Sequence, residues 1–499
     1  MHFTSLNFKI IGHFLGLLLT VNGLFILAAT IVGYIYGDPE MFNMLLSGIT
    51  VLVLGGLFMV LTRNRKTEIQ KKDGYLIVSL GWVVMAISGT FPYIFTGAIP
   101  NVVDAFFETM SGYTTTGASI LSDIESLPKG ILLWRSLTHW MGGMGIIVLA
   151  IAILPLLGIG GMQLFTAEAP GPSTDKLHPR IADTAKRLWF LYVGFTVLET
   201  IFLSLAGMSF FDALNHSLST LSTGGFSTKN NSLAFWNDTP LIQYIVILFM
   251  GIAGTNFILS YFAFTGKIQR IIKDEEFKWY VLFVVLFTGL CVLVLVPNGM
   301  GDSTIAHPEV WGRNESLFRH SLFQVLAIVT TTGFVSADFT FWPPFLTLFF
   351  FGLMFLGGSA GSTAGGIKIV RHIILIKNGI LEFKRSLHPR AILPVRYNNK
   401  AVQQPIVYTI LAFFILYMLA FIVGVLVFSW LGLDFTTALG GSASALGNIG
   451  PALGNLGPTF NYGHLPDAAK LWATFLMLIG RLELFTVLIL FTPFYWRNR

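Results

Sequence analysis

Four short loops, each ending in glycine, recur at near-equal spacing along this chain. Their last residues are Gly117, Gly225, Gly333 and Gly450, and successive glycines lie 108, 108 and 117 residues apart. Each loop follows an apolar, aromatic-rich segment. Self-similarity at a fixed long period indicates a repeat architecture. Four polar loops inside an apolar chain predict four units whose loops meet on one axis.

The composition places the chain in a membrane. Of its 499 residues 54% are hydrophobic and only 11% are charged, whereas a soluble domain carries about 25% charged residues. Cys291 is the single cysteine, which excludes a disulfide within the chain and argues against a cysteine-based metal site. The net charge of +6 would favour nucleic acid as a partner of a soluble protein, but here the basic residues gather in loops between apolar runs.

The distribution of Lys and Arg predicts the orientation. Basic loops at 63–73, 158–187, 265–278 and 368–400 alternate with loops that are poor in Lys and Arg. Such loops face the cytoplasm. The first apolar run, 10–36, is too long for a signal-peptide core and lacks a convincing cleavage site. We therefore expect a retained first span, cytoplasmic termini and an even number of spans.

About ten spans are expected, because a span needs about 20 apolar residues. They lie near 10–36, 41–62, 74–97, 131–157, 185–207, 240–264, 277–297, 343–375, 402–432 and 468–495. Four shorter apolar segments, 103–116, 211–223, 317–330 and 435–447, lie between spans, and each leads into a glycine loop. Non-helical backbone at membrane depth is tolerated only where it is buried or lines a water-filled cavity. We interpret these segments as re-entrant pore helices.

The predicted fold is thus an all-α integral membrane protein. Four repeats of span, pore helix, filter loop and span form a pseudo-fourfold arrangement, preceded by two extra N-terminal spans. The boundaries are 1–70 for the extra spans, 71–160 for repeat 1, 161–266 for a cytoplasmic loop and repeat 2, 267–378 for repeat 3 with a glycine-rich loop, and 379–499 for a cytoplasmic loop and repeat 4.

Three aspartates are placed to start the pore helices. Asp104 and Asp212 each lie 13 residues before their loop glycine, and Asp434 lies 16 before Gly450. Aspartate is a favourable N-cap, and a helix capped outside points the negative end of its dipole at the loop. The third repeat departs from this pattern, because His320 holds the matching position.

The loops supply the ligands that an ion-selectivity filter needs. Backbone carbonyls can replace the hydration shell of potassium, and glycine permits the unusual dihedral angles involved. A single such loop could be a helix-ending turn or a small-residue helix contact, but four copies at this spacing argue against that. The expected filter residues are Thr115, Thr116, Gly117, Thr223, Gly224, Gly225, Thr331, Thr332, Gly333, Asn448, Ile449 and Gly450.

Segment 343–375 predicts a break in a span. As one helix, at 1.5 Å per residue, it would run about 50 Å, against a hydrocarbon core of about 30 Å. Its centre holds Gly357, Gly358, Gly361, Gly365 and Gly366. We expect a mobile loop below the filter; close helix packing through small residues is the alternative. A phosphate-binding loop is excluded, since Ile367 follows Gly366 where that motif needs lysine.

Two charged residues fall near the middle of expected spans, where charge costs about 2.5–3.5 kcal/mol on insertion scales. Arg481 is either a pore-lining positive charge below the filter or part of a buried ion pair. Glu199 is either bonded to polar groups of a pore helix, which we favour, or part of a pore cation site.

The loops, together with three further stretches, resemble the Trk/Ktr/HKT superfamily of potassium transporters, most closely its bacterial TrkH branch, over nearly the whole chain. These stretches are 140–145 with 153–163, 168–172 with 176–180, and 357–368. In plant relatives serine at the first filter glycine goes with sodium transport, so four glycines imply potassium. The resemblance also implies gating by the 357–366 loop and Arg481, a bacterial inner-membrane location and a homodimer. It further implies a cytosolic TrkA-like nucleotide-binding ring, for which basic loops containing His178 and His388 offer docking surfaces.

The expected function is potassium uptake through a channel-like filter, driven by the membrane potential because the chain has no ATPase motif. No enzyme activity, cofactor or nucleic-acid partner is expected, and potassium is the transported ion. Coupling to protons or sodium stays open. A coupled secondary transporter would show inverted repeats, whereas all four loops enter from one side. A membrane enzyme would need clustered titratable groups facing a cavity, and those here are scattered.

Overall fold

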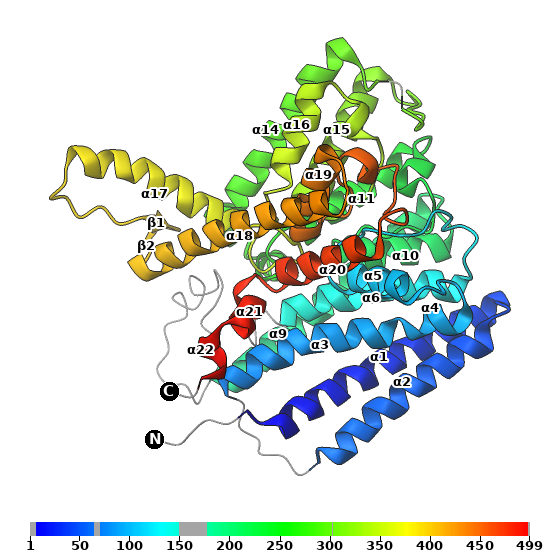
Figure 1. Ribbon diagram of the computed structural model, residues 1–499. Helices are drawn as coiled ribbons and strands as arrows, with labels where there is room; N and C mark the ends of the chain where they lie inside the picture. The colour runs from blue at the N-terminus through cyan, green and yellow to red at the C-terminus, as the bar shows by residue number, and fades with distance from the viewer. Residues whose placement is uncertain (1–5, 64–69, 149–176, 302, 498–499) are drawn as a thin grey trace.

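The computed structural model describes residues 6–63, 70–148, 177–301 and 303–497. The described residues are mainly helical (Figure 1). Their strands are β1 (Arg396–Tyr397) and β2 (Lys400–Ala401), which pair antiparallel in a small hairpin. The predicted all-α membrane fold is confirmed.

Two long helices form the edge of the molecule at the N-terminal end of the chain. Helix α1 (Phe8–Tyr36) and helix α2 (Met41–Leu61) correspond to the two extra spans and lie side by side (Figure 1). Gly23 lies against Leu52, and a side chain on Gly23 would overlap that residue's backbone. Small residues allow helix backbones to approach closely in a membrane.

The rest of the chain runs four times through a helix, a short helix, a glycine loop and a further helix. The first set is α3 (Lys71–Gly89), α4 (Phe91–Thr96), α5 (Val102–Tyr113) and α6 (Lys129–Val148). The second is α9 (Leu177–Leu205), α10 (Phe210–Leu221), η3 (Ser232–Trp236), α11 (Pro240–Ala253) and α12 (Phe257–Phe264). The third is α13 (Ile268–Lys273), α14 (Glu275–Asn298), α15 (Arg313–Val329), η4 (Phe339–Phe341), α16 (Pro344–Leu353) and α17 (Ile369–Leu387). The fourth is α18 (Gln404–Trp430), α19 (Phe435–Gly447), η5 (Gly454–Leu456), α20 (Asp467–Arg481), α21 (Phe485–Leu488), η6 (Ile489–Phe491) and α22 (Pro493–Trp496).

Among the described residues six helices are long and apolar enough to cross a membrane, or up to eight if each of two bent helix pairs is one span. Ten spans therefore remain a prediction. The end of the expected span 131–157, and with it motif residues 153–163 and 168–172, lies outside the described residues. Figure 1 shows α1 beginning and α22 ending on the side where α17 and the hairpin project from the body.

The predicted caps of the first two short helices are wrong. Asn101 caps α5 by accepting from the backbone of Val103 and Asp104, so the helix begins before Asp104. Asp104 instead bonds Lys470 of α20 at 2.6 Å. Ser209 caps α10, and the Asp212 carboxylate accepts from Thr228 at 2.6 Å. Each aspartate lies in the first turn of its helix, where its negative charge interacts favourably with the positive end of the helix dipole.

The caps of the other two short helices differ from each other. Asp434 caps α19 by accepting from the backbone of Thr437 at 3.1 Å, as predicted. In the third repeat α15 begins at Arg313 after Gly312, which lacks a capping side chain. His320 therefore lies inside this longer helix, so it is not a cap.

Two spans expected to be continuous are broken. Helices α11 and α12 meet at a bend of 108°, where the Asn256 side chain caps the new helix by accepting from Ile258 at 2.9 Å. Helix α20 and the segment 485–491 meet at 110°, with Glu483 and Leu484 at positive φ. The third break, between α16 and α17, is where the glycines predicted it.

Candidate ion pathway: four glycine loops and the loop beneath them

The four glycine loops share one backbone conformation. The residue two before each glycine has positive φ: 50° at Thr115, 54° at Thr223, 55° at Thr331 and 55° at Asn448. The glycines follow at 79°, 82°, 74° and 102°. Positive φ is a genuine outlier for a β-branched residue. Its recurrence at three threonines shows that the surroundings dictate it, and asparagine, which tolerates this region, replaces threonine in the fourth loop.

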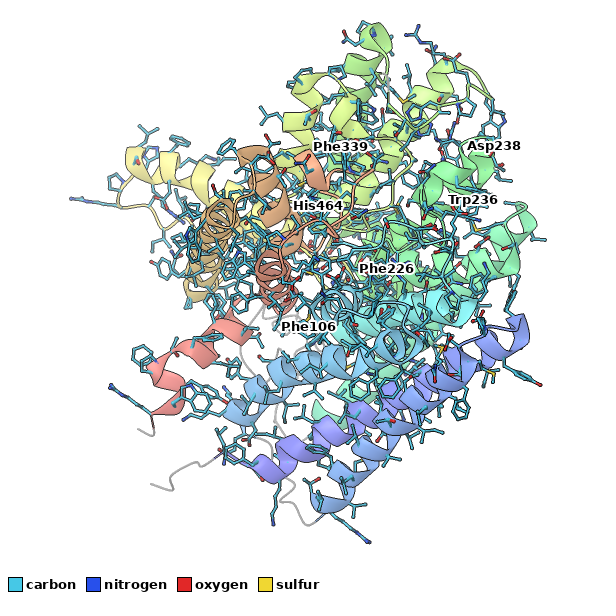
Figure 2. All side chains as sticks on the ribbon, turned by 45° about the vertical axis from the view of Figure 1, so that its right-hand side comes forward. Phe106, Phe226, Trp236, Asp238, Phe339 and His464 are labelled. Atoms are coloured by element: carbon cyan, nitrogen blue, oxygen red, sulfur yellow. The ribbon has the colours of Figure 1, made fainter. Side chains whose placement is uncertain are left out.

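The loops close into a ring. The α-carbon of each loop glycine faces a backbone carbonyl oxygen of the next repeat: Gly117 faces Gly224, Gly225 faces Thr332, Gly333 faces Ile449, and Gly450 faces Thr116. A Cβ at any of the four would come closer to that oxygen than real Cβ atoms do. Eight of the twelve residues predicted from the sequence thus meet in one closed ring, in the order of the repeats. Phe226, directly after Gly225, lies near the middle of the helices in Figure 2.

A small hollow adjoins the ring. Its volume is about 90 Å³, and all four loop glycines line it. Arg135 and Lys229 line it as well.

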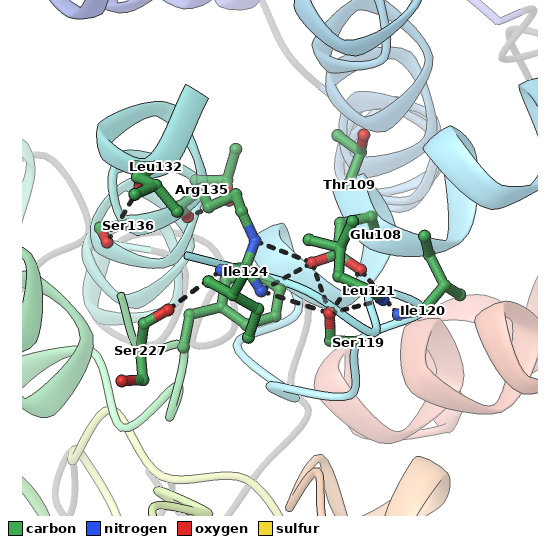
Figure 3. Close-up of polar contacts among 12 residues, drawn as sticks. Glu108, Thr109, Ser119, Ile120, Leu121, Ile124, Leu132, Arg135, Ser136 and Ser227 are labelled. Atoms are coloured by element: carbon green, nitrogen blue, oxygen red, sulfur yellow. Dashed lines mark hydrogen bonds and ion pairs between the residues drawn. The ribbon is translucent and has the colours of Figure 1, made fainter. Parts of the chain in front are cut away.

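A buried ion pair stands behind the first two loops (Figure 3). Glu108 of α5 forms an ion pair with Arg135 of α6 at 2.8 Å, and both side chains are almost fully buried. The carboxylate also accepts from Ser119 Oγ at 3.0 Å and from the backbone of Ile120 at 3.0 Å, just after Gly117. Arg135 donates to the Ser227 carbonyl at 3.1 Å, just after Gly225. One ion pair therefore connects two neighbouring loops.

In the second and third loops, hydrogen bonds replace the ion pair, and they come from residues at the same distance before the loop glycine. Glu108, His216 and Gln324 each lie nine residues before their loop glycine. His216 Nε2 contacts Ser227 Oγ at 2.9 Å, and Gln324 donates to Ser336 Oγ at 3.4 Å. The sequence analysis missed these residues, and their shared spacing was the available signal.

In the fourth repeat the residue nine positions before Gly450 is a glycine, so other side chains hold this loop. Ser444 Oγ and the Tyr462 hydroxyl both donate to the Gly450 carbonyl, at 2.9 and 3.0 Å. The Asn448 amide donates to Thr116 Oγ1 of the first loop at 3.0 Å. The ring is therefore pseudo-symmetric, as the missing threonine predicted.

The glycine-rich segment 354–368 between α16 and α17 lies directly against the ring. The Gly365 N–H donates to Thr331 Oγ1 at 2.6 Å. Thr363 Oγ1 donates to the Leu221 carbonyl at 2.9 Å, where α10 ends. A side chain on Gly365 would overlap the Gly447 carbonyl. The segment is thus a loop packed against three of the four repeats rather than a helix contact.

The other two helix breaks meet the same loop. Ser359 donates its N–H to the Gly254 carbonyl at 2.9 Å, and Phe257 donates to the Gly361 carbonyl at 3.2 Å. Both Gly254 and Phe257 flank the bend between α11 and α12. The break at the end of α20 brings Arg481 to the loop. Polar backbone opened by the first bend is thus satisfied by the loop, as membrane depth requires.

Arg481 is buried in the last turn of α20 and donates from Nη1 to the Thr363 carbonyl at 2.8 Å. Its Nε and Nη2 have no hydrogen-bond partner among the described residues, which also show no ion pair for it. Glu483 instead pairs with Arg371. The geometry disfavours the ion-pair interpretation and keeps the positive charge at the loop.

Glu199 of α9 is fully buried beside Thr220 of α10. Neither of its carboxylate oxygens has a hydrogen-bond partner in the described part of the chain. The carboxyl group thus lies beside a polar group of the pore helix, as predicted, and a hydrogen bond between them stays a prediction. Within the same residues no group of three or more His, Cys, Asp or Glu side chains could hold a metal ion.

The sequence profile of the family described as TrkH, cation transport protein, matches residues 40–498. The chain belongs to the TrkH family. It is 40% identical, over 99% of its length and 100% of the relative's, to the Trk system potassium uptake protein TrkH of Vibrio parahaemolyticus. It is 34% identical to the Trk system potassium uptake protein TrkG of Escherichia coli K12, over 98% and 99% of the two chains.

A crystal structure of the potassium transporter TrkH from Vibrio parahaemolyticus has the same fold. The TM-score is 0.88 at 38% identity, and 98% of this chain and 100% of that one are covered. The resemblance to the TrkH branch is thus confirmed. The four repeats and their closed ring are features of a TrkH-family chain.

Proposed function

We propose that this TrkH-family chain takes up potassium across the bacterial inner membrane through a channel-like selectivity filter. The observation that carries the proposal is the closed ring in which every loop glycine faces a carbonyl of the next repeat. Rings of backbone carbonyls replace the hydration shell of potassium. The names of the relatives, which are potassium uptake proteins, favour the same ion.

The ion-binding residues in this proposal are the four loops. Positive φ at the first residue and at the glycine of each triplet turns successive carbonyls relative to an ordinary strand. The proposed ligands are the carbonyl groups of Thr115, Thr116, Gly117, Thr223, Gly224, Gly225, Thr331, Thr332, Gly333, Asn448, Ile449 and Gly450. The membrane potential drives uptake, since it supplies about 2.3 kcal/mol per charge per 100 mV.

The gate in this proposal is the loop between α16 and α17. It is buried against the ring, so ions pass only when it moves. Arg481 holds it through Thr363 and places a positive charge where a cation would leave the filter. The glycines that permit its rearrangement are Gly357, Gly358, Gly361, Gly365 and Gly366.

Partners are proposed on two grounds. The relatives belong to a named Trk system, in keeping with a cytosolic TrkA-like nucleotide-binding ring as regulator. Helix α17 projects from the body (Figure 1). It exposes an apolar stripe at helical spacing, which consists of Ile376, Ile380, Phe383 and Leu387. A homodimer would cover this stripe.

Uptake of rubidium-86 into proteoliposomes, with excess unlabelled potassium or sodium as competitor, tests the function. Competition by potassium and not by sodium is expected. Equal competition by both ions would keep the pore but refute the potassium assignment. Absence of uptake with the cytosolic regulator present would refute the permease itself.

A further inference from the structure

One buried carboxyl group bonds both the middle of the glycine-rich loop and the first turn of the helix that follows it. Glu276, in the first turn of α14, is almost fully buried. Its Oε1 atom accepts from the backbone N–H of Ala360 at 2.8 Å and from that of Val370 at 3.1 Å. Ala360 lies in the middle of segment 354–368, and Val370 lies in the first turn of α17, just after it. Among the described residues Glu276 forms no ion pair. Both of its hydrogen bonds go to backbone N–H groups, one in the loop and one at the start of α17.

The two bonds fix the span of the loop. Residues 361–369 lie between the two bonded amides, so this segment cannot straighten or withdraw while both bonds hold. Because one side-chain oxygen accepts from both backbone N–H groups, it holds the two amides at one point. Two backbone bonds also close the loop, since Ile367 accepts from the Gly357 N–H and Ile369 donates to the Gly358 carbonyl. Its other bonds, at Gly361, Thr363 and Gly365, go to neighbouring repeats and to Arg481. Among these contacts Glu276 is the side chain that bonds both the loop and the start of α17, so one substitution removes two bonds.

The start of α14 is also tied to the projecting hairpin. Asn398, in the β1–β2 turn, exchanges two hydrogen bonds with Glu275: its N–H donates to the carboxylate at 3.0 Å, and its Oδ1 accepts from the Glu275 N–H at 2.8 Å. Its amide donates to Asp274 at 3.1 Å. Lys377 of α17 forms an ion pair with Glu275. The residues next to Glu276 thus connect it to a hairpin that stands out from the body (Figure 1).

We propose that Glu276 is a positioning residue that holds the gate closed, as a latch, and that the β1–β2 hairpin is coupled to it through Asp274 and Glu275. A displacement of the hairpin moves the start of α14, withdraws the carboxylate from Ala360 and Val370, and frees the loop. The inference rests on the proposed gating function of this loop.

Glu276→Ala tests the latch in proteoliposomes that lack any regulator. Rubidium-86 uptake is expected to rise at least fivefold over the unaltered protein, with the preference for potassium over sodium unchanged because the ring is untouched. Glu276→Gln keeps an oxygen that can accept both bonds, and it should restore uptake to within twofold of the unaltered protein. Glu382→Ala is the matched control, since it removes a carboxylate whose ion pair with Arg385 is exposed.

A conformational readout separates failure of the latch from failure of the proposed function, because it needs no transport. In a Cys291→Ser background, Ser362→Cys places one thiol in the buried loop. Modification by a water-soluble thiol reagent should be several-fold faster in Glu276→Ala than in Glu276→Gln. Equal rates would overturn the latch even if transport is potassium-selective. Faster labelling in a protein that never transports rubidium would support the latch and contradict the function.

Two further variants test the Val370 hydrogen bond and the contact with the hairpin. Val370→Pro removes one of the two donors to Glu276, at a first-turn position where proline is tolerated. The Ser362→Cys thiol should then be labelled at an intermediate rate. If neither this variant nor Glu276→Ala folds, Glu276 has a structural role and the latch is refuted. Asn398→Asp sets a carboxylate against Asp274 and Glu275. It should also speed labelling, and an unchanged rate would refute the role of the hairpin.

Discussion

Gly365 donates its backbone N–H to the side-chain oxygen of Thr331 at 2.6 Å, which bonds the glycine-rich loop directly to the third loop of the ring. The two residues are 34 positions apart in the chain and belong to the two features that the sequence singled out separately. Their contact means that the conformation of the loop and that of the ring are coupled by a hydrogen bond rather than by proximity alone.

Thr331→Val is expected to destabilise the protein. Valine keeps the branched shape but leaves the buried Gly365 N–H without an acceptor, which costs about 1–3 kcal/mol. Thr115→Val is the matched control, because the Thr115 hydroxyl occupies the same place in the first loop and has no partner among the described residues. Thermal unfolding in detergent should show a lower Tm for Thr331→Val than for Thr115→Val. Equal values would contradict the coupling.

Gly117→Ser is expected to weaken discrimination between potassium and sodium by about tenfold, or about 1.4 kcal/mol. The added Cβ would overlap the Gly224 carbonyl, and φ at this position is 79°. The neighbouring oxygen must therefore move. Competition of sodium with rubidium uptake measures the effect. Gly56→Ala is the control, since its Cβ would meet no atom within 4 Å. Unaltered selectivity in Gly117→Ser would mean that the ring does not set ion preference.

Breaking the Glu108–Arg135 pair is expected to destabilise the first two loops together. Removing one partner of a buried ion pair costs about 3–5 kcal/mol, because the other charge remains buried. Glu108→Gln should therefore lower Tm far more than Glu125→Gln. Glu125 pairs with Lys229 in a partly exposed position, where such pairs contribute about 0–1 kcal/mol. A double-mutant cycle with Arg135→Met isolates the coupling, and a coupling near zero would count against the brace.

Arg481→Gln is expected to raise rubidium uptake in the absence of a regulator. Glutamine can still donate to the Thr363 carbonyl, so the change mainly removes the positive charge. Arg481→Lys should stay close to the unaltered rate. Initial uptake rates measure the difference, and identical rates for the two variants would show that the charge does not oppose cations there.

Local features of the sequence were sufficient for the loops and for one cap. Each loop glycine tolerates the positive φ that it adopts, whereas positive φ at the loop threonines depends on their surroundings. Asp434 caps its helix through the helix's own first turn. Asp104 was misassigned because Asn101, three residues earlier, is an equally good cap and starts the helix first. Asn101 and Asp104 are both good N-cap residues, and the sequence pattern alone does not show which of the two begins the helix.

The helix bends after Gly254 and after Arg481 escaped the sequence analysis for a different reason. Hydropathy stays high through both, so each reads as a continuous span. What makes the first break stable is distant in the chain: the Gly254 carbonyl is satisfied by Ser359 and the Phe257 N–H by Gly361. A pattern within one span cannot report that partner.

The sequence by itself determined the membrane class, the four repeats, the glycine loops and the break between α16 and α17, because each follows from local backbone freedom, apolar length or spacing. Only the tertiary structure decided which groups meet. Glu276 binds backbone 84 and 94 residues away, and Arg135 reaches a carbonyl 92 residues away. Such pairs form because burial in an apolar interior leaves each polar group dependent on whatever partner the fold brings within reach.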